Sequence, residues 1–445
     1  MPRSAYIILL AFLILSIGIR LWLNKPQSLP RNVDLKFEAT VKSEPKIYET
    51  GQVISIADAK IYTGLYPKYR VGDRILVSGK INDSGKMFSA KVEKVGEAGG
   101  FGLLRTRLRD KISRNIGAML PAREATLVVG SVLGVDNIGQ QFRDELTKTG
   151  TIHVVVVSGQ NLMIVSGILM ALAPYIGRRK SLVLATFAVV AYAFLAGFEP
   201  PVLRAAVMVF AVTLAMFFGR EVNVLWTLGM AAFIIVFLFP QSLFEVSFQL
   251  TFAATLGILT LGKWLDGVLS ALLRGNPVSL PLISLSHSLG RDQRSVLNLH
   301  DVHRSQNSEI TPSRAPSRHS WLKESLVQNA AIATSAYLFT APVIIFYFGR
   351  ISPLAPLANL LVAEAVFPIM VLGFVTAAAS LVFIPVAQLF AYFAFVPAFY
   401  FSQVVRCFAA LPFGQYSFGQ GNWILVISAY IVLLTFLWMV KTKRF

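Results

Sequence analysis

The stretch Thr149–Leu169, TGTIHVVVVSGQNLMIVSGIL, decides how the rest of the chain is interpreted. It is long and apolar enough to cross a bilayer, which takes about 20 residues. It nevertheless carries His153, Ser158, Gln160 and Asn161. On an ideal helix His153 and Gln160 lie on one side, and Ser158 and Asn161 lie on another. A polar group without a partner in hydrocarbon costs roughly 2–7 kcal/mol, so we expect this segment inside a helical bundle or along a cavity.

Gly159 favours an interruption of this helix, because glycine costs about 1 kcal/mol in a helix interior. Interrupted helices at membrane depth are found where they pack in protein or face water, as in many transport sites. The alternative is a helix whose polar groups only bond neighbouring helices. The residues by themselves leave both interpretations open.

The composition is that of a polytopic membrane protein, with 445 residues, 55% hydrophobic and only 14% charged. The single cysteine, Cys407, excludes an internal disulfide and a multi-cysteine metal site. The net charge of +18 is expected mainly to orient the chain through cytoplasmic Lys and Arg. The same charge also suits anionic lipids or a polyanion such as nucleic acid.

The chain divides into regions of different character. We expect a retained membrane anchor in residues 1–32, because no small-residue cleavage site follows its apolar run. The further regions are an all-β domain (33–97), amphipathic and re-entrant helices (98–148), a first membrane part (149–262), a basic cytoplasmic loop (263–323) and a second membrane part (324–445).

Short alternating runs in residues 33–97 predict a small β-barrel of about five strands. Aromatic and basic residues gather in one of its loops, as in barrels that bind a nucleic-acid strand. They are Tyr62, Tyr66, Lys68, Tyr69 and Arg70. A solvated loop with no ligand explains the same residues.

The region after the barrel begins with leucines and isoleucines at helical spacing among five basic residues, the pattern of a helix on the membrane surface. The next apolar run, Ala125–Leu133, is too short to span. Its Gly130 and Gly134 form a small-xxx-small pair that predicts close helix packing or a re-entrant segment.

We expect about ten membrane helices with both termini cytoplasmic and the barrel outside. The predicted spans are 5–23, 152–174, 181–197, 201–219, 222–239, 243–262, 326–347, 353–379, 382–410 and 423–440. This order puts nearly all basic clusters on the cytoplasmic side, with the turn near residue 380 inside and the GFEPP turn at 197–201 outside.

Further polar residues lie within the predicted spans, where a charge costs about 2.5–3.5 kcal/mol and usually marks a pathway or a pair. Arg204 follows the Pro200–Pro201 turn, and Glu245 and Gln249 share one helix face. Asn359 lies in the 353–379 span. The alternative for Arg204 and Glu245 is contact with the outer interface.

No enzyme or cofactor chemistry is indicated. Ser158 and His153 lie about 140° apart on a helix and cannot pair within it. No GxxxxGK[ST] nucleotide loop occurs, so we expect another protein to drive any transport. The HDVH run at His300–His303 has a metal-ligand spacing, but it has no surrounding fold to make a site.

Four short motifs occur in order behind the predicted barrel, and together they resemble the ComEC-type competence proteins. These motifs are Gly150–His153 with Val157–Asn161, Val202–Ala205 with Met208, Phe248–Phe252, and Ser352 with Asn359–Leu360. That family usually has SGLH where this chain has SGQN, and serine where it has Thr251. The resemblance covers roughly residues 35–440.

The resemblance implies an OB-like barrel and a bacterial plasma-membrane channel for inward transfer of single-stranded DNA in natural transformation. Longer family members end in a metallo-β-lactamase-like domain, and we expect this form to lack it. A DNA receptor, a separate nuclease and a cytoplasmic motor are expected partners, beside membrane lipids; the oligomeric state stays open.

The residues expected to line the path are His153, Ser158, Gly159, Gln160, Asn161, Arg204, Glu245, Gln249 and Asn359. Two alternatives remain. One is a transporter of a small solute or a lipid-linked precursor, and the other is a membrane assembly protein that transports nothing.

Overall fold

The structure is a computed structural model. It describes residues 18, 29–41, 45–48, 51–57, 59–88, 90–96, 101–135, 138–155, 159–197, 200–217, 224–273, 318–412, 415–418, 421 and 423–442. The chain forms two compact units. The first unit comprises residues 1–210, 232–243 and 364–410, and the second comprises residues 211–231, 244–363 and 411–445. Apart from residue 18, the predicted anchor at 5–23 lies outside the described residues, as does the HDVH run.

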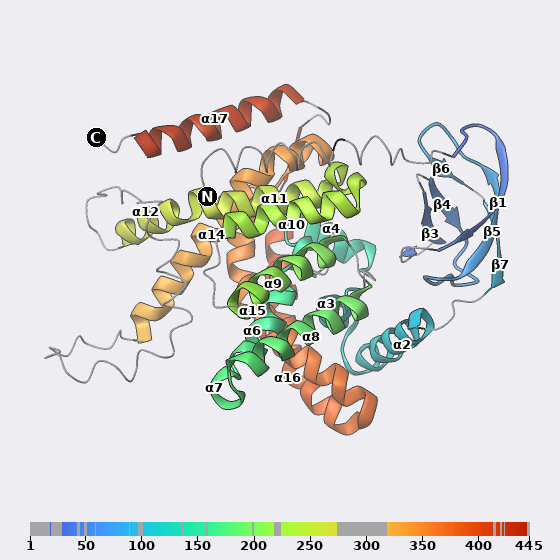
Figure 1. Cartoon of the computed structure of the whole chain (residues 1–445), viewed down its shortest axis with the longest axis horizontal. Coiled ribbons are helices and arrows are strands. Elements are labelled where there is room, and N and C mark those ends of the chain that lie inside the picture. Colours follow the sequence, from blue (N-terminus) through green and yellow to red (C-terminus); the bar gives the residue numbers. More distant parts are fainter. Residues whose placement is uncertain are drawn as a thin grey trace, which may run out of the picture. The chain divides into compact units, whose positions relative to one another are not determined.

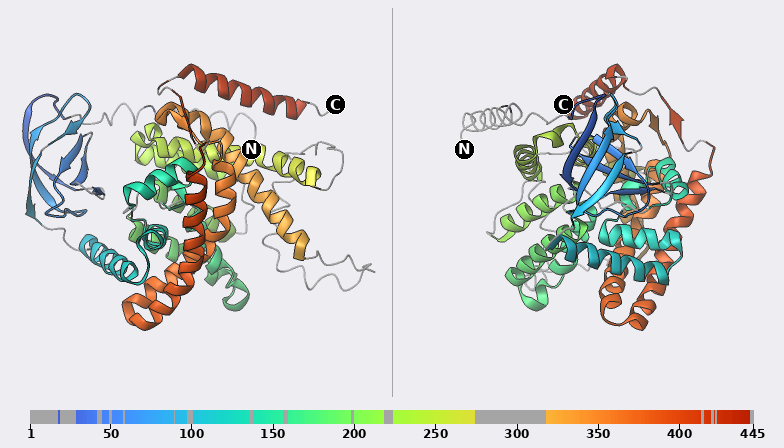
Figure 2. Two further views of the ribbon diagram at one scale, coloured as in Figure 1. Left: turned by 180° about the vertical axis from the view of Figure 1, so that it is seen from behind. Right: turned by 90° about the vertical axis from the view of Figure 1, so that its right-hand side faces the viewer.

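The first unit begins with a β domain of seven strands in two antiparallel-rich sheets (Figures 1 and 2). One sheet has the order β1-β5-β7 and the other the order β2-β3-β4-β6. The strands are β1 (Asp34–Thr40), β2 (Lys46–Tyr48), β3 (Gly51–Ile56), β4 (Ala59–Thr63), β5 (Arg74–Lys80), β6 (Lys86–Met87) and β7 (Lys91–Gly96). The sequence predicted fewer strands because β2 and β6 are too short to show alternation.

The two sheets share one apolar core, which follows from the alternation of side chains along each strand. Ile54 on β3, Ile61 on β4 and Ile75 on β5 are fully buried, and strands β3 and β4 pair antiparallel with Ile54 opposite Ile61. The small β domain is therefore as predicted, while an OB topology stays a prediction.

Nine helical segments of the first unit surround its apolar interior. They are α2 (Phe101–Met119), α3 (Ala122–Leu133), α4 (Gln140–Thr149), α5 (Ile152–Val155), α6 (Gly159–Met170), α7 (Ala173–Ile176), α8 (Arg178–Ala196), α9 (Pro200–Phe217) and α16 (Ile384–Ala409). Helix α3 contacts α2, α5, α8 and α16. The part of the chain expected to be amphipathic thus supplies a central helix.

Two glycines allow helices to approach α3 closely. A Cβ on Gly130 would lie 2.7 Å from the Val155 carbonyl oxygen of α5. A Cβ on Gly373, in the following helix α15 (Ala355–Val382), would lie 2.8 Å from a methyl group of Val132. Close packing is therefore the correct interpretation of Gly130, whereas Gly134 ends α3 in the left-handed conformation.

The second unit is built around α11 (Val246–Gly257) and α14 (Arg318–Phe348), which pack side by side. A Cβ on Gly257 would lie 2.5 Å from the Ser335 carbonyl oxygen, so only glycine permits this approach. The other elements are η2 (Ile258–Gly262), α12 (Lys263–Leu273), β8 (Arg350–Ile351), β9 (Tyr416–Ser417) and α17 (Trp423–Thr442). Helices α9, α10 (Val224–Leu238) and α15 are divided between the units, and η1 (Pro240–Phe244) lies almost wholly in the first.

Five helical spans in the described residues are long and apolar enough to cross a membrane. They are Arg178–Ala196, Val246–Leu272, Leu326–Phe348, Ala355–Val382 and Ile384–Ala409. Shorter apolar helices occupy four more of the predicted spans. The predicted loop at 263–323 was too long, because α12 continues to Leu273 and α14 already starts at Arg318.

Candidate functional site

The central segment folds as separate short helices. Helix α4 ends at Gly150, whose left-handed φ of 69° lets the chain turn. The Thr151 amide donates to the Leu146 carbonyl at 2.9 Å and closes this turn. Helix α5 then covers only Ile152–Val155, and α6 begins at Gly159. Gly159, where the sequence predicted an interruption, is the first residue of α6, and residues 156–158 with Ser158 lie outside the described part.

Asn161 is fully buried, and its function in the structure is to bond the end of another helix. Its Nδ2 donates to the Ser131 carbonyl of α3 at 3.1 Å. The Tyr192 hydroxyl of α8 donates to the same oxygen at 2.9 Å. Ser131 lies in the last turn of α3, where carbonyls have no donor within the helix. Asn161 and Tyr192 together therefore cap α3 from two other helices.

Gly159 meets Ala205, the neighbour of Arg204 in the chain, at the contact between α6 and α9. A Cβ on Gly159 would lie 3.2 Å from the Ala205 Cβ, so α6 and α9 approach closely there. Arg204 is only 1% exposed and lies beside Val202 and Ala205 of an apolar cluster. The alternative that Arg204 extends to the outer interface is therefore wrong, and its charge lies inside the first unit.

The other residues of the central motif are placed differently. His153 on α5 is exposed. The backbone of Gln160 belongs to α6, but its side chain is outside the described part. Of the predicted path residues described in this unit, Asn161 and Arg204 are buried and Gly159 is partly buried.

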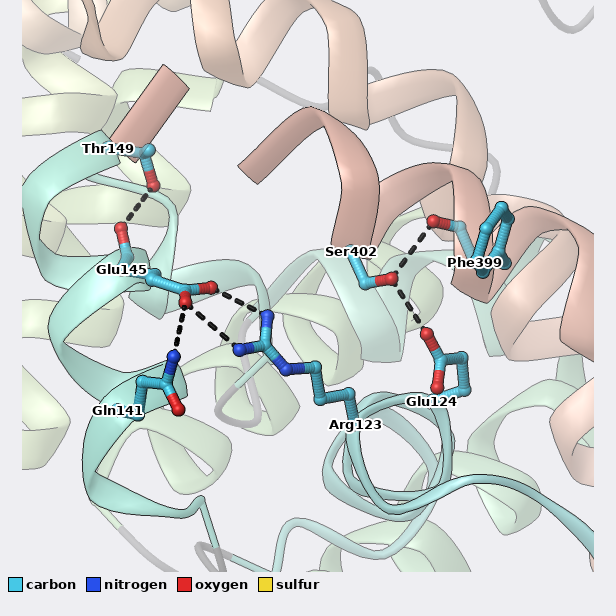
Figure 3. A network of polar contacts seen from close by, with 7 residues as sticks. All are labelled: Arg123, Glu124, Gln141, Glu145, Thr149, Phe399 and Ser402. Atoms are coloured by element: carbon cyan, nitrogen blue, oxygen red, sulfur yellow. Dashed lines mark hydrogen bonds and ion pairs between the residues drawn. The ribbon is translucent and has the colours of Figure 1, made fainter. Parts of the chain in front are cut away.

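A polar network joins α3 to its neighbours (Figure 3). Arg123 donates two hydrogen bonds to the Glu145 carboxylate of α4, at 2.8 and 3.0 Å, and its guanidinium lies over the Phe142 ring. The adjacent Glu124 is buried and accepts a hydrogen bond from Ser402 of α16 at 2.7 Å. Two successive residues thus tie α3 to α4 and α16. The sequence does not indicate these contacts, because the partners are distant in the chain.

Two further arginines are buried at the end of α8. A Cβ on Gly197, which ends α8, would lie 3.6 Å from an Nη1 atom of both Arg105 and Arg109. These arginines belong to α2 and are 8% and 4% exposed. The carboxyl end of a helix carries partial negative charge and favours nearby cations. The sequence predicted a helix on the membrane surface with five basic residues beside its apolar stripe, and Arg105 and Arg109 are the two of these that are buried.

Glu245, Gln249 and Asn359 lie in the second unit. Glu245 precedes α11, and its carbonyl accepts from the Phe248 and Gln249 amides. Asn359, near the start of α15, has a buried Oδ1 without a hydrogen-bond donor in the described structure. The predicted path residues therefore divide into two sets, one in each unit.

The β domain presents an aromatic pair on the β3-β4 side. Tyr62 stacks on Phe88 with ring centroids 4.8 Å apart, and Phe88 is 57% exposed. Lys60 is exposed two residues before Tyr62 on β4 and pairs in register with Lys86 of β6. Stacked aromatics beside lysines are typical of single-strand binding surfaces. Phe88 and the two lysines could not be grouped with Tyr62 before the strands were paired.

The predicted aromatic loop is only partly available to a ligand. Gln52 holds this loop through bonds from its Nε2 to the Gly64 and Pro67 carbonyls, and Tyr66 is 76% exposed at the tip. Lys68 is also exposed. The prediction is wrong for Tyr69, which is buried and donates its hydroxyl proton to the Val92 carbonyl.

Two charges beside the loop have defined effects. Arg70 forms an ion pair with Asp110 of α2 at 2.9 Å. Burial and the Glu93 carboxylate raise the pKa of Tyr69 above its ordinary value of 10.0. We therefore place the candidate contact surface on Tyr62, Phe88, Tyr66 and the nearby lysines.

Comparison with known proteins identifies the helical part. The sequence profile of the family described as "Competence protein" matches residues 132–292 and 303–443, more than half of the chain. An uncharacterized protein of Aquifex aeolicus (strain VF5) is 36% identical over 155 residues, and this match spans 35% of each chain. No solved structure matches. The matched residues contain α4 to α9 and α14 to α16, with all four motifs, and the chain therefore belongs to the competence protein family.

Proposed function

We propose that this protein conducts single-stranded DNA inward across the bacterial plasma membrane during DNA uptake. Membership of the competence protein family carries the proposal, because the matched residues include every buried polar position of the central segment. Five apolar helices of spanning length give the chain the membrane character that such a route requires.

The interior of the first unit supports the proposal. Arg204 is nearly fully buried among apolar helices. Charged residues in membrane-spanning bundles usually mark a pathway for a charged or polar solute. A DNA strand carries one negative charge per nucleotide, so cationic groups at this depth suit it. In this proposal Arg204 and the exposed His153 are path residues of the first unit, and Glu245, Gln249 and Asn359 are path residues of the second.

The β domain is proposed to receive the strand on the outer face of the membrane. A base can stack on the Tyr62–Phe88 pair, which would contribute about 1–3 kcal/mol for each base. Lys60 and Lys86 would contact the phosphates. Both termini are proposed to be cytoplasmic, and a DNA receptor, a nuclease and a motor are proposed as partners that supply capture, strand removal and force.

A membrane assembly protein is the second candidate. Its supporting observation is that Asn161 bonds the end of α3 instead of facing an opening. If all polar groups of the motif served packing in this way, the protein would transport nothing.

The test measures entry of labelled DNA into the cytoplasm at matched protein levels. Cells would carry the native chain, no chain, or a Tyr62→Ala, Phe88→Ala variant. We expect no entry without the chain and strongly reduced entry with the variant. The control is Val95→Ala, because Val95 is similarly exposed (55%) on β7 of the other sheet and has no aromatic ring.

Equal DNA entry with and without the chain would overturn the channel proposal and favour the assembly protein. DNA entry could be normal with the double variant and absent without the chain. That result would support the channel but contradict strand binding by the Tyr62–Phe88 pair.

A further inference from the structure

Helix α2 lies at the ends of several long helices of the first unit. Its Arg105 and Arg109 approach Gly197 at the end of α8. Its Asn115 donates from Nδ2 to the Ser380 carbonyl, at 2.9 Å, near the end of α15. It also contacts α16, which begins two residues after α15 ends (Figure 1). Since α8, α15 and α16 have spanning length, α2 lies where membrane helices end, at the depth of lipid head groups.

The outward face of α2 is cationic. Arg107, Lys111 and Arg114 are all exposed and follow the i, i+4, i+7 spacing of one helix face. The apolar residues Ile112 and Ile116 are on the opposite side and are buried in the protein. The acidic Asp110 lies on the flank and is engaged by Arg70. The exposed face therefore presents three positive charges over about 10 Å of helix.

The turn beside α2 is apolar and exposed. Between α15 and α16 the chain reads LVFI over residues 381–384, with no charged residue. Val382 is 89% exposed, Phe383 57% and Ile384 47%. Contiguous exposed apolar residues next to cations are typical of membrane contact sites. Exposure of this turn to water would be unfavourable, whereas acyl chains would cover it.

We propose that α2 and the α15–α16 turn form a binding surface for anionic phospholipids. The turn 381–384 lies at the level of α2, where its apolar side chains reach the upper part of the acyl chains and Arg107, Lys111 and Arg114 contact the phosphate groups. The turn then lies in the membrane interface, whereas the sequence predicted a cytoplasmic turn near residue 380. This inference stands independently of DNA transport.

A nucleic-acid strand would account for the cations but leaves the apolar turn unexplained. A lipid leaflet supplies both contacts at once, with anionic head groups for the basic face and hydrocarbon for the turn. Each basic residue near an anionic surface contributes measurably to such binding. The combination of the two features therefore favours lipid.

The test places an environment-sensitive fluorophore on the turn of the full-length protein. The chain would carry Phe383→Cys in a Cys407→Ser background, because the native Cys407 is exposed. It would be reconstituted in bilayers of phosphatidylcholine and phosphatidylglycerol. In one preparation the phosphatidylcholine is brominated on its acyl chains, and in the other the phosphatidylglycerol is. We expect quenching by bromolipid and little quenching by aqueous iodide. Strong iodide quenching without bromolipid quenching would overturn the inserted turn.

A second comparison tests the head-group contacts. In the parent protein we expect brominated phosphatidylglycerol to quench several-fold more effectively than brominated phosphatidylcholine. Replacing Arg107, Lys111 and Arg114 by glutamine should remove this preference while quenching by brominated phosphatidylcholine persists. The control replaces three exposed lysines of the β domain, Lys36, Lys80 and Lys91, and changes net charge equally.

The lipid site would be overturned if the α2 variant kept the stronger quenching by brominated phosphatidylglycerol. It would also be overturned if the β-domain control lost this preference. A reduction in binding of an oligonucleotide by the α2 variant, with lipid preference unchanged, would overturn it in favour of nucleic acid.

Discussion

At the scale of single residues, the Ser131 carbonyl shows how this membrane protein satisfies its backbone. Asn161 and Tyr192 both donate to it, and each comes from a different helix. We expect Tyr192→Phe to lower the free energy of unfolding by about 0.5–1.5 kcal/mol, since Asn161 still donates. Asn161→Leu with Tyr192→Phe should cost more than the two single changes added, because a buried carbonyl without a donor costs about 1–3 kcal/mol.

Unfolding of the reconstituted protein in mixed detergent and dodecyl sulfate micelles would measure this coupling. Ser166→Leu serves as a control on α6, because Ser166 lies outside the buried cluster. If the losses in free energy of unfolding from Asn161→Leu and Tyr192→Phe were strictly additive, the two residues would not share the Ser131 carbonyl as a cap.

Tyr69 gives a pH dependence to the β domain. Its pKa is raised by burial and by Glu93, and its hydroxyl donates to Val92 at 2.6 Å. The neutral form is favoured in the folded state. Its stabilisation is therefore complete below the unfolded pKa of about 10 and is lost as the pH rises through the higher folded pKa. We expect the β domain to loosen above about pH 10.

Amide hydrogen exchange in peptides of β5 and β7 would report this change, with native and Tyr69→Phe proteins compared at each pH. The phenylalanine variant should be less protected near neutral pH, by about 1 kcal/mol for the lost hydrogen bond. Its disadvantage should shrink above about pH 10. A constant difference at all pH values would contradict a role for Tyr69 ionisation.

At the scale of elements, the close approach of α3 and α5 depends on one missing side chain. A Cβ on Gly130 would lie 2.7 Å from the Val155 carbonyl oxygen, which is backbone and cannot rotate away. We expect Gly130→Ala to destabilise the first unit by about 1–3 kcal/mol through overpacking. Thermal unfolding in detergent would show the loss.

Gly117→Ala is the matched control, because a Cβ there meets nothing within 4 Å on helix α2. It should raise stability by about 0.5–1 kcal/mol, since alanine is the better helix former. Similar effects of both changes would show that Gly130 is not a packing contact.

At the scale of the whole molecule, α2 restricts how the chain crosses the membrane. Arg109 and Asn115 are six residues apart, a rise of about 9 Å, while the hydrocarbon core is about 30 Å thick. They contact the end of α8 at Gly197 and the end of α15 at Ser380. Both ends therefore lie at one face of the first unit. Five predicted spans lie between them, an odd number, so the predicted alternation needs revision there.

Single cysteines test this arrangement in a Cys407→Ser background. Ala118 on α2 and Arg179 at the start of α8 are both exposed. Helix α8 is about 28 Å long and α2 lies at its far end, so Ala118→Cys and Arg179→Cys should react with an impermeant thiol reagent from opposite sides. Labelling of both cysteines in intact cells would contradict a crossing by α8. The unmutated background should give no labelling.

The local patterns of the sequence predicted the membrane class, the β domain and most helix positions. Long apolar runs such as those in α15 and α16 have few ways to satisfy their backbone other than as helices. The four motifs similarly predicted the competence family, which the family profile confirms. These features depend on residues close in the chain, so a sequence pattern contains them.

The partners of individual side chains were decided only by the tertiary structure. The sequence predicted Tyr69 as an exposed loop aromatic, but its hydroxyl bonds Val92 of β7. It predicted Asn161 as a path residue, but its side chain bonds the last turn of α3. Glu124 meets Ser402 across 278 positions, and Asn115 meets Ser380 across 265. The apolar composition already required that polar groups be satisfied inside a helical bundle. Which groups satisfy one another depends on long-range packing, because no local spacing encodes a contact between distant helices.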